Sequence, residues 1–192
     1  ELDKIITGDS AVVLQSFPPD CIDLTVTSPP YDNLRTYNGF TFDFETIAKE
    51  LFRVTKVGGV VVWVVGDQTK SGNETLTSFK QAIYFQSVGF NVETMIYEKK
   101  NYKPTMAKRY DNVFEYIFVF SKGAVKTFNP IMVEKARVKA ENGKYRQKDG
   151  SFIERRRKLN QMKKHTNIFS YSIGGHIADK IAFRHPAIFP EA

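Results

Sequence analysis

The run Val60–Val65 constrains the fold more than any other part of this sequence. Five of its six residues are valine and the sixth is Trp63, so a strand here is apolar on both faces, as in a parallel sheet covered by helices. A shorter alternating strand is expected at Ile22–Val26, and an amphipathic helix between the two at Phe44–Val54. Strand, helix and strand in succession indicate a parallel crossover. The sequence therefore predicts an α/β fold.

Two further stretches extend the expected sheet. Phe90–Glu98 alternates between polar and apolar residues, and Glu115–Phe120 is an apolar run of strand length. Only a loop separates them, so they should pair as an antiparallel hairpin at one edge of the sheet. The remaining expected elements are a strand at Ile5–Ile6, helices over 11–14 and 77–87, and a turn at Gly58–Gly59 that ends the first long helix.

Composition is that of a single globular domain. A length of 192 residues allows a sizeable core, and hydrophobic and charged contents of 42% and 26% are ordinary. No apolar run is long enough for a transmembrane helix, and no signal-peptide pattern is present. The single cysteine, Cys21, excludes an internal disulfide and suits a reducing cytoplasm. The three histidines are not spaced as metal ligands with that cysteine, so no metal site is expected.

Positive charge is concentrated in one stretch. Residues 134–164 hold twelve Lys and Arg against four Asp and Glu, a net charge of +8, whereas the whole chain carries +7. A basic stretch on a nearly neutral body favours a polyanionic partner that docks at one place. The alternative is a solvated loop whose charges only keep the protein soluble, and charge alone does not separate the two.

The stretch Thr27-Ser28-Pro29-Pro30-Tyr31 suggests a chemistry. It follows a strand, where ligands bind in open α/β sheets, and its prolines stiffen the backbone. The exocyclic amine of cytosine or adenine is a weak nucleophile, because its lone pair is delocalised into the ring. The Ser28 hydroxyl and the Pro29 carbonyl can accept hydrogen bonds from such an amine, and Tyr31 can stack on a base taken out of a duplex. The alternative is a rigid turn with Tyr31 packed in the core.

This stretch resembles the catalytic motif of the amino-group DNA methyltransferases, in which Asp, Asn or Ser precedes Pro-Pro and an aromatic residue. Ser28 gives the form that is most frequent in N4-cytosine enzymes, whereas N6-adenine enzymes more often have Asp or Asn there. The resemblance extends to Ile5–Ser10, Asp32–Tyr37 and His185–Glu191. It covers nearly the whole chain except the basic middle.

The resemblance implies a Rossmann-like methyltransferase sheet, mostly parallel with an antiparallel edge pair, and S-adenosylmethionine as the cofactor. It also implies a cytoplasmic enzyme of prokaryotic or phage type. The residues that it assigns to catalysis are Ser28, Pro29, Pro30 and Tyr31, and those that it assigns to the cofactor are Asp9, Thr27, His185, Pro186 and Phe189. Asp9 can equally cap a helix with Ser10. A general acid or base role for His185 is disfavoured, because the reaction needs a held amine more than a strong base.

Double-stranded DNA is the partner that the resemblance implies. The resemblance also divides a single domain into three parts. These are a catalytic part of the core (1–126), a basic insert in the place of the target-recognition region (127–167) and a return to the core (168–192). Lysines and arginines would mostly neutralise phosphates, and only a few would read base edges. The residues expected at the DNA are Arg35, Lys103, Arg109, Arg155, Arg156, Arg157 and Lys158.

One part of the family's pattern is missing. With the catalytic motif first in chain order, as in a β-like class, a Phe-x-Gly-x-Gly-type cofactor loop should come just after Ala192. No such motif occurs in the 192 residues. We therefore expect a fragment or one half of a split enzyme, which binds S-adenosylmethionine weakly by itself. A missing C-terminal half and a second copy of the chain are its candidate protein partners.

Three function classes stay open at this point. The first is methyl transfer to N4 of cytosine, with N6 of adenine as the alternative acceptor. The second is a DNA-binding fragment without activity of its own. The third, an RNA or protein methyltransferase, lacks support from the residues that flank the Pro-Pro pair.

Overall fold

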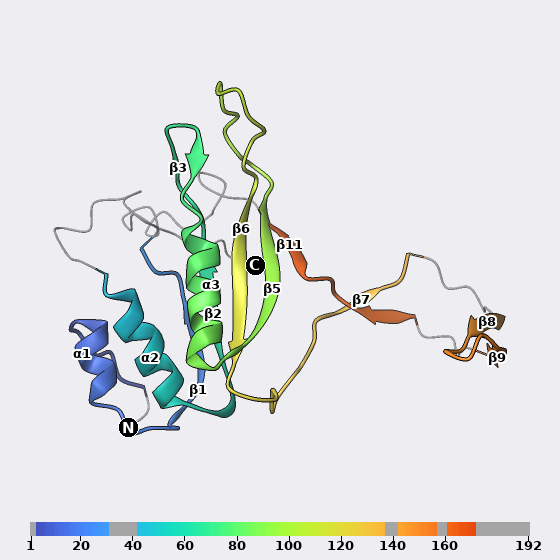
Figure 1. Ribbon diagram of the computed structural model, residues 1–192, viewed down its shortest axis with the longest axis horizontal. Helices are drawn as coiled ribbons and strands as arrows, with labels where there is room; N and C mark the ends of the chain where they lie inside the picture. The colour runs from blue at the N-terminus through green and yellow to red at the C-terminus, as the bar shows by residue number, and fades with distance from the viewer. Residues whose placement is uncertain (1–2, 31–41, 137–141, 157–160, 172–192) are drawn as a thin grey trace. The chain divides into compact units, whose positions relative to one another are not determined.

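The computed structural model of this chain describes residues 3–30, 42–136, 142–156 and 161–171. The chain divides into two compact units (Figure 1). The sheet unit comprises Glu1–Thr127 and Asn167–Ala192, and the hairpin unit comprises Phe128–Thr166. Among the described residues, no helix is both long and apolar enough to span a bilayer.

A five-stranded sheet forms the centre of the sheet unit. Its order is β1 (Ile22–Thr27), β2 (Thr55–Val65), β6 (Phe114–Ser121), β5 (Asn91–Lys99) and β11 (Ile168–Tyr171). β1 and β2 pair in parallel, as do β5 and β11, and β6 is antiparallel to both of its neighbours. The predicted parallel crossover and the antiparallel pairing of β5 with β6 are therefore confirmed. The pair is not at the edge of the sheet, because β11 pairs in parallel with the outer side of β5.

The carboxyl ends of β1, β2 and β5 lie at one edge of this sheet, because these three strands run in the same direction. Ser28 follows β1 at this edge. The small hairpin of β3 (Thr69–Lys70) and β4 (Asn73–Glu74) follows β2, and the loop of residues 100–113 follows β5. Both extend beyond the ends of the strands in Figure 1. This edge is where an open α/β sheet binds its ligands.

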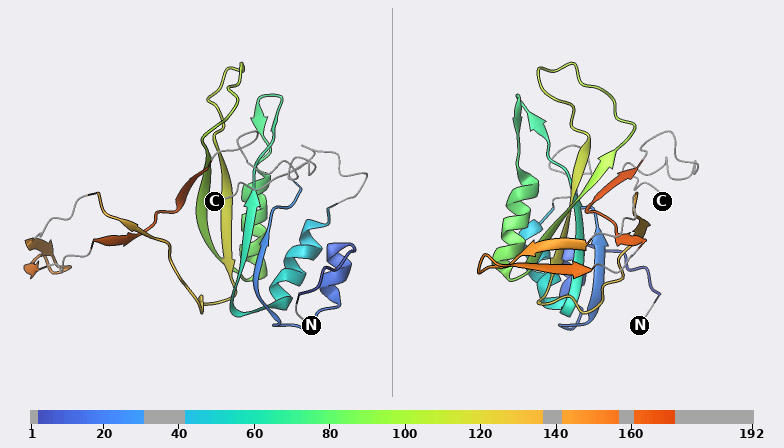
Figure 2. Two further views of the ribbon diagram at one scale, coloured as in Figure 1. Left: turned by 180° about the vertical axis from the view of Figure 1, so that it is seen from behind. Right: turned by 90° about the vertical axis from the view of Figure 1, so that its right-hand side faces the viewer.

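Three helices lie on one face of the sheet: α1 (Ser10–Gln15), α2 (Phe44–Val54) and α3 (Thr77–Val88) (Figures 1 and 2). The amphipathic helix that the sequence predicts is α2, which buries Ile47, Ala48, Leu51 and Val54. The Asp43 carboxylate caps its first turn by accepting from the Thr46 amide at 3.2 Å. The apolar stripe and the cap together explain why a helix forms here.

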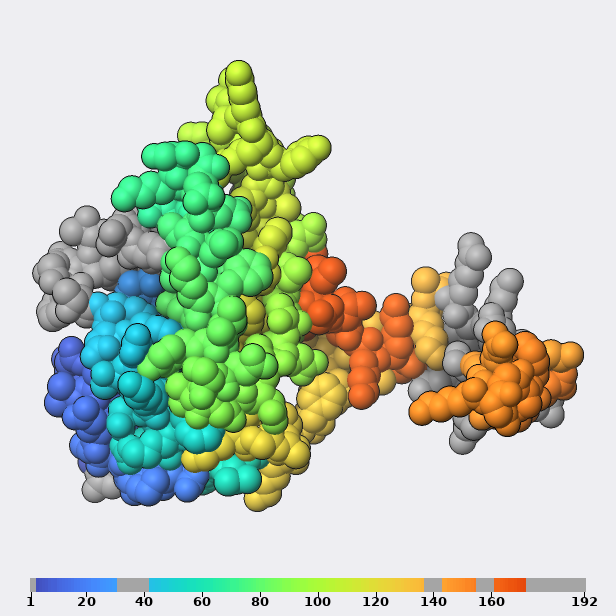
Figure 3. Space-filling view, in the orientation of Figure 1, coloured from blue at the N-terminus to red at the C-terminus, as the bar shows by residue number. Residues whose placement is uncertain are grey.

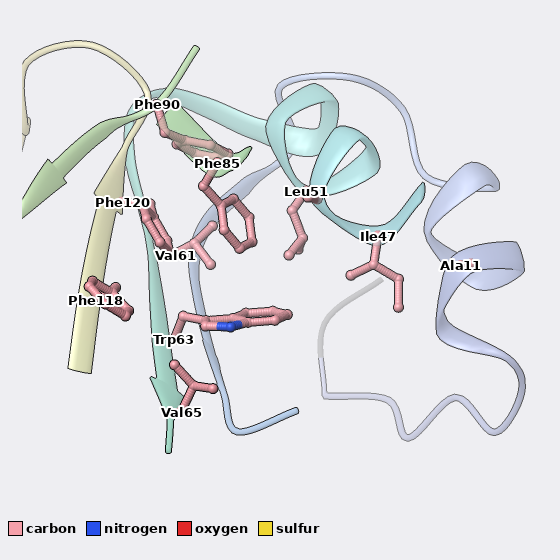
Figure 4. Packing of buried hydrophobic residues seen from close by; sticks show 11 residues of the cluster. Ala11, Ile47, Leu51, Val61, Trp63, Val65, Phe85, Phe90, Phe118 and Phe120 are labelled. Atoms are coloured by element: carbon pink, nitrogen blue, oxygen red, sulfur yellow. The ribbon is translucent and has the colours of Figure 1, made fainter. Parts of the chain in front are cut away.

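Aromatic residues fill the space between these helices and the sheet (Figure 4). Phe85 of α3 stacks on Phe120 of β6, with ring centroids 4.2 Å apart, and contacts Trp63 of β2 edge-on at 5.1 Å. The buried Trp63 indole donates to the Gln81 side chain of α3 at 2.9 Å. The core therefore ties β2 and β6 to α3, on the face that also carries α1 and α2.

Two predictions in the sheet unit are wrong. Ile5–Ile6 lies in a segment without regular structure, and it pairs with no strand among the described residues. Gly58–Gly59 does not end a helix, since α2 ends at Val54 and β2 begins at Thr55. A Cβ atom on Gly59 would lie 2.9 Å from the carbonyl oxygens of Asp23 and Lys56. Close approach of the backbone of β1, and not a helix end, therefore explains this glycine.

The hairpin unit consists of two antiparallel pairs, β7 (Met132–Glu134) with β10 (Met162–Lys164), and β8 (Asn142–Arg146) with β9 (Phe152–Arg156). Between β8 and β9 the chain turns at Gly150, which has a φ of +87° and donates to the Gln147 carbonyl at 3.0 Å. None of its described residues is buried. The described part of this unit therefore has no hydrophobic core of its own.

Candidate active site

Strand β1 carries the predicted catalytic residues to the carboxyl edge of the sheet. Thr27 is its last residue and pairs with Trp63 of β2, and Ser28 follows directly. Pro29 is buried, whereas Ser28 and Pro30 are half-buried. Because prolines have no backbone N–H to extend the ladder, the strand stops here. The fourth predicted catalytic residue, Tyr31, lies outside the described residues.

A cavity of about 450 Å³ opens beside these residues. Its hydroxyl-bearing wall is formed by Ser10, Thr25, Thr27 and Ser28, and the rest is Gly8 and apolar side chains: Ile6, Val13, Leu14, Pro29, Pro30, Phe42, Ile47, Leu51 and Trp63. This volume falls within the roughly 300–1,000 Å³ of small-molecule sites, which are also mostly apolar with a few polar groups. The cavity is therefore large enough for a base or part of a nucleoside.

Asp9 stands at the start of α1 and caps it. Its carboxylate accepts from the amides of Ala11 at 2.8 Å and Val12 at 3.4 Å. The neighbours Gly8 and Ser10 line the cavity, but Asp9 is not part of its lining. A Cβ atom on Gly8 would lie 2.9 Å from a methyl carbon of Val13, so α1 packs closely over this segment. The cap that the sequence left open for Asp9 is present, and its contact with a cofactor stays a prediction.

An arginine of α2 holds α1 against the sheet unit. The Arg53 guanidinium donates to the carbonyl oxygens of Leu14 at 2.9 Å and Phe17 at 2.8 Å. It also forms an ion pair with Glu50 at 2.6 Å. Arg53 thereby adds a charged donor to carbonyls at and just after the end of α1, where the Leu14 carbonyl also accepts from the Phe17 amide at 3.1 Å. Since Leu14 lines the cavity, this brace fixes one of the cavity's walls.

Asp67, at the same edge of the sheet, has a structural role. Its carboxylate accepts from the Ser78 amide at 2.8 Å and from the Ser78 hydroxyl, at the start of α3. It is not among the residues that line the cavity. Asp67 therefore caps the start of α3.

Two tyrosines of the sheet are held in their neutral form. Burial, and then the negative charge of Glu115, raise the pKa of Tyr97 to about 12. Burial, followed by the charges of Asp67 and Glu74, also raises the pKa of Tyr116. Both phenols therefore stay neutral to a higher pH than an exposed tyrosine does.

The other predicted residues are distributed over both units. Lys103 and Arg109 are exposed on the 100–113 loop of the sheet unit. The backbones of Arg155 and Arg156 belong to β9 of the hairpin unit, and their side chains are not described. Six predicted residues lie outside the described residues: Arg35, Arg157, Lys158, His185, Pro186 and Phe189.

Several cavity residues were not predicted from the sequence. Thr25 precedes Thr27 by two positions on β1, so both side chains face the same side of the sheet. This alternation could have identified Thr25. Trp63 and Phe42 come from distant segments, and no local sequence signal points to their place in the cavity.

Residues 22–192 of the sequence match the DNA methylase family of N6 and N4 methyltransferases. This match covers most of the chain. The chain belongs to the DNA methylase family.

One relative of this DNA methylase is the orphan methyltransferase M.BamHII of Bacillus amyloliquefaciens. The two are 52% identical over 183 residues, which cover 90% of this chain and 69% of the relative. The amino-group DNA methyltransferase that the sequence predicted is thereby confirmed as the family.

Two solved structures resemble this DNA methylase. One is TTHA0409 of Thermus thermophilus, described as a DNA modification methylase, with a TM-score of 0.51 and 28% identity over 64% of this chain and 55% of that one. The same protein has also been solved in complex with S-adenosyl-L-methionine. The other is the cytosine-N4-specific PvuII DNA methyltransferase, with a TM-score of 0.58 and 19% identity over 95% of this chain and 64% of that one.

These similarities establish the class of fold and the cofactor of the family. The sheet is the Rossmann-like α/β sheet of DNA methyltransferases, as predicted. The cofactor of the family is S-adenosylmethionine. The chain spans 55% to 69% of the length of these three proteins.

Proposed function

We propose that this chain holds the target amine in a DNA methyltransferase that moves a methyl group from S-adenosylmethionine to N4 of cytosine. One observation carries the proposal: Ser28, Pro29 and Pro30 line a cavity of about 450 Å³ at the carboxyl end of β1. The serine at position 28 favours cytosine. N6 of adenine is the alternative acceptor, because its amine is chemically similar.

Ser28 and Pro29 act on the amine before transfer. The Ser28 hydroxyl oxygen and the Pro29 carbonyl oxygen each accept a hydrogen bond from one amine N–H, which draws the nitrogen lone pair out of conjugation with the ring. When bound, S-adenosylmethionine supplies an electrophilic methyl group on a sulfonium. The amine forms a bond to the methyl carbon as the carbon–sulfur bond breaks, and one amine proton is released to solvent. Tyr31 stacks on the flipped base in this proposal.

The walls of the cavity suit the part of the cofactor that lies next to the target amine. Hydroxyls of Ser10, Thr25 and Thr27 supply hydrogen-bond partners for polar groups, and Ile47 and Leu51 supply apolar surface. Asp9 is proposed to contact the cofactor, from a carboxylate that also caps α1 next to the cavity residues Gly8 and Ser10. The predicted contacts of the cofactor's methionine end are His185, Pro186 and Phe189.

Duplex DNA is the proposed substrate, and the hairpin unit is proposed to dock it. Lys163 and Lys164 are exposed on β10, and Lys144 is exposed on β8. An exposed ion pair between Lys144 and Glu154, at 3.5 Å, costs little to separate. These cations are therefore available to phosphates.

A further set of strands is proposed to complete the sheet next to β1. This strand is at the edge of the described sheet, so the backbone N–H and C=O groups on its outer side pair with no other described strand. Such an edge can pair with a further strand. The strands that carry the missing glycine-rich cofactor loop, from a C-terminal half, fit this place. Pairing with a second copy of the chain is the alternative.

Transfer of labelled methyl from S-adenosylmethionine to duplex DNA, followed by nucleoside analysis, tests the proposal. We expect N4-methylcytosine with the wild-type chain and none with Ser28→Ala. Ser87→Ala is the matched control, because Ser87 lies on the surface of α3 and donates only to the Tyr84 carbonyl among the interactions described. It should leave transfer unchanged.

Other products would change the conclusion in specific ways. N6-methyladenine would keep the mechanism and correct the base. Transfer that persists in Ser28→Ala would contradict the role of this hydroxyl. DNA binding without any transfer would favour the fragment that lacks activity of its own, and adding a chain with the glycine-rich loop should then restore transfer.

A further inference from the structure

The loop of residues 100–113 exposes two large side chains almost completely. Met106 is 100% exposed and Tyr110 is 98% exposed. Tyr102, on the same loop, is also exposed. Single exposed apolar side chains are common on proteins, but a methionine and a tyrosine within five residues form an apolar tip. Their surface contributes nothing to the stability of the sheet unit, so it is available to a partner.

The loop nevertheless has a defined shape. At its base, the Lys99 amide donates to the Val113 carbonyl at 2.7 Å, and the Lys99 ammonium pairs with Glu115 at 2.7 Å. Within it, the Asp111 carboxylate accepts from the Thr105 amide at 2.7 Å. Figure 3 shows the loop, in yellow-green, standing clear of the strands that carry it. These interactions therefore fix the backbone of the loop that carries the tip.

Positive charge surrounds this apolar tip. Residues 100–112 include four cationic side chains and one carboxylate, that of Asp111, which is bound to the loop's own backbone. Lys103, Lys108 and Arg109 are exposed. Apolar surface alone would suit many partners, but the exposed cations on the same loop select a polyanion that also has apolar faces. Base pairs stacked between phosphate strands have this chemistry.

The loop also emerges at the edge of the sheet where Ser28 lies. β5, which precedes the loop, runs in the same direction as β1, which precedes Ser28. A base that leaves the duplex for the cavity leaves a gap in the stack. Apolar side chains that enter between base steps stabilise such a distortion. A loop at this edge can therefore act on the same duplex as the cavity.

We propose that the 100–113 loop is a DNA wedge, in which Met106 and Tyr110 enter the base stack and Lys103, Lys108 and Arg109 contact the phosphates on either side. This inference rests on the proposed function, since it assumes that the substrate is duplex DNA. In this proposal the apolar tip distorts the duplex, and the cations provide affinity that does not depend on the DNA sequence.

Binding to two duplexes that differ only by one central abasic site tests the wedge, with fluorescence anisotropy as the readout. The wild-type chain should bind the abasic duplex about tenfold more tightly, because unstacking there is already complete. The double variant Met106→Ala/Tyr110→Ala should lose most of this preference. Its DNA affinity should depend on salt concentration as that of the wild type does. Its fold should be unaffected, since both side chains lie in solvent, and thermal unfolding checks this.

Two control variants separate the parts of the proposal. Val57→Ala/Ile83→Ala removes two exposed apolar side chains elsewhere on the sheet unit and should keep the preference. Lys103→Ala/Lys108→Ala/Arg109→Ala should weaken binding to both duplexes equally and lower the salt slope by about 0.9 for each phosphate that is no longer neutralised.

A preference retained by Met106→Ala/Tyr110→Ala would overturn the wedge and leave the proposed function intact. Equal binding of both duplexes by the wild-type chain would do the same. If the wild-type chain bound neither duplex, the wedge and the proposed DNA substrate would both be wrong.

Discussion

Trp63 joins the core to the candidate site. Its buried indole packs against Phe85, donates to Gln81 and lines the cavity beside Ser28. A buried tryptophan needs a partner for its N–H, and Gln81 on α3 provides it. The position of this one side chain therefore depends on β2 and α3 together.

Trp63→Phe should destabilise the protein by about 1–3 kcal/mol beyond the effect of lost volume, because the buried Gln81 oxygen is left without its donor. Trp63→Phe/Gln81→Met should recover part of that loss, since both polar groups are then removed. Urea unfolding of the wild type, both single variants and the double variant measures this coupling. Additive effects in the cycle would show that the hydrogen bond contributes nothing.

Tyr97 makes the stability of the sheet unit sensitive to alkaline pH. Its folded pKa of about 12 lies above the ordinary value of 10.0, so the folded state favours the neutral phenol. The stabilisation is complete below pH 10 and is lost as the pH rises towards 12. Melting temperatures should therefore fall over this range.

Tyr97→Phe should reduce this alkaline loss of stability, because phenylalanine has no proton to release. Thermal unfolding measured by circular dichroism between pH 9 and pH 12 provides the comparison, and Tyr110→Phe, at an exposed position, serves as the control. Equal slopes for the wild type and Tyr97→Phe would contradict the assigned cause.

At the level of elements, the short helix α1 depends on its neighbour α2. A helix of six residues is too short to be stable alone. Its start is capped by Asp9 and its last carbonyls are bound by Arg53. The wall of the cavity that α1 provides is therefore maintained by a side chain of another helix.

Arg53→Met should lower the free energy of unfolding by about 1.5–3 kcal/mol, since hydrogen bonds from a charged donor to two carbonyls are removed. Arg53→Lys keeps the charge but not the fork of donors, so it should be intermediate. In Arg53→Met, the amides of α1 should exchange with solvent faster than in the wild type, whereas the exchange rates of the β2 amides should not change. Uniform acceleration throughout the chain would instead indicate global destabilisation.

The elements that were predictable are those whose signal is local. The valine run of β2 and the apolar stripe of α2 report burial directly, so both elements were found. The bounds of α2 agree with the prediction, whereas β2 begins at Thr55 and not at Val60. Gly59 was misassigned because its cause is the close backbone of β1, which lies far away in sequence. The wall of the cavity formed by Trp63 and Phe42 was missed for the same reason. The place of Ser28 could be predicted, because a strand precedes it and two prolines follow it.

On the scale of the whole molecule, charge and core are separated. The sheet unit contains the hydrophobic core, and the hairpin unit carries most of the net positive charge and no buried residue among those described. The concentration of charge was visible in the sequence. The pairing of β7 with β10 was not, since these strands are distant in sequence.

Replacing Arg155, Arg156, Arg157 and Lys158 by alanine should lower the salt dependence of DNA binding. Each phosphate that is no longer neutralised should reduce the slope of log Kd against log salt concentration by about 0.9. Lys49→Ala/Lys80→Ala, on the surfaces of α2 and α3, is the control and should keep the wild-type slope. An unchanged slope in the quadruple variant would exclude the hairpin unit as the main phosphate-binding surface.

The hairpin unit is one uninterrupted segment, entered after Thr127 and left before Asn167. Two recombination points in the gene are therefore enough to exchange the whole hairpin unit. The order of the strands in the sheet does not change. Variation in this segment leaves the cavity residues of β1 and α1 untouched. Descendants of such a gene can therefore vary the proposed DNA-docking segment while they inherit the residues of the cavity unchanged.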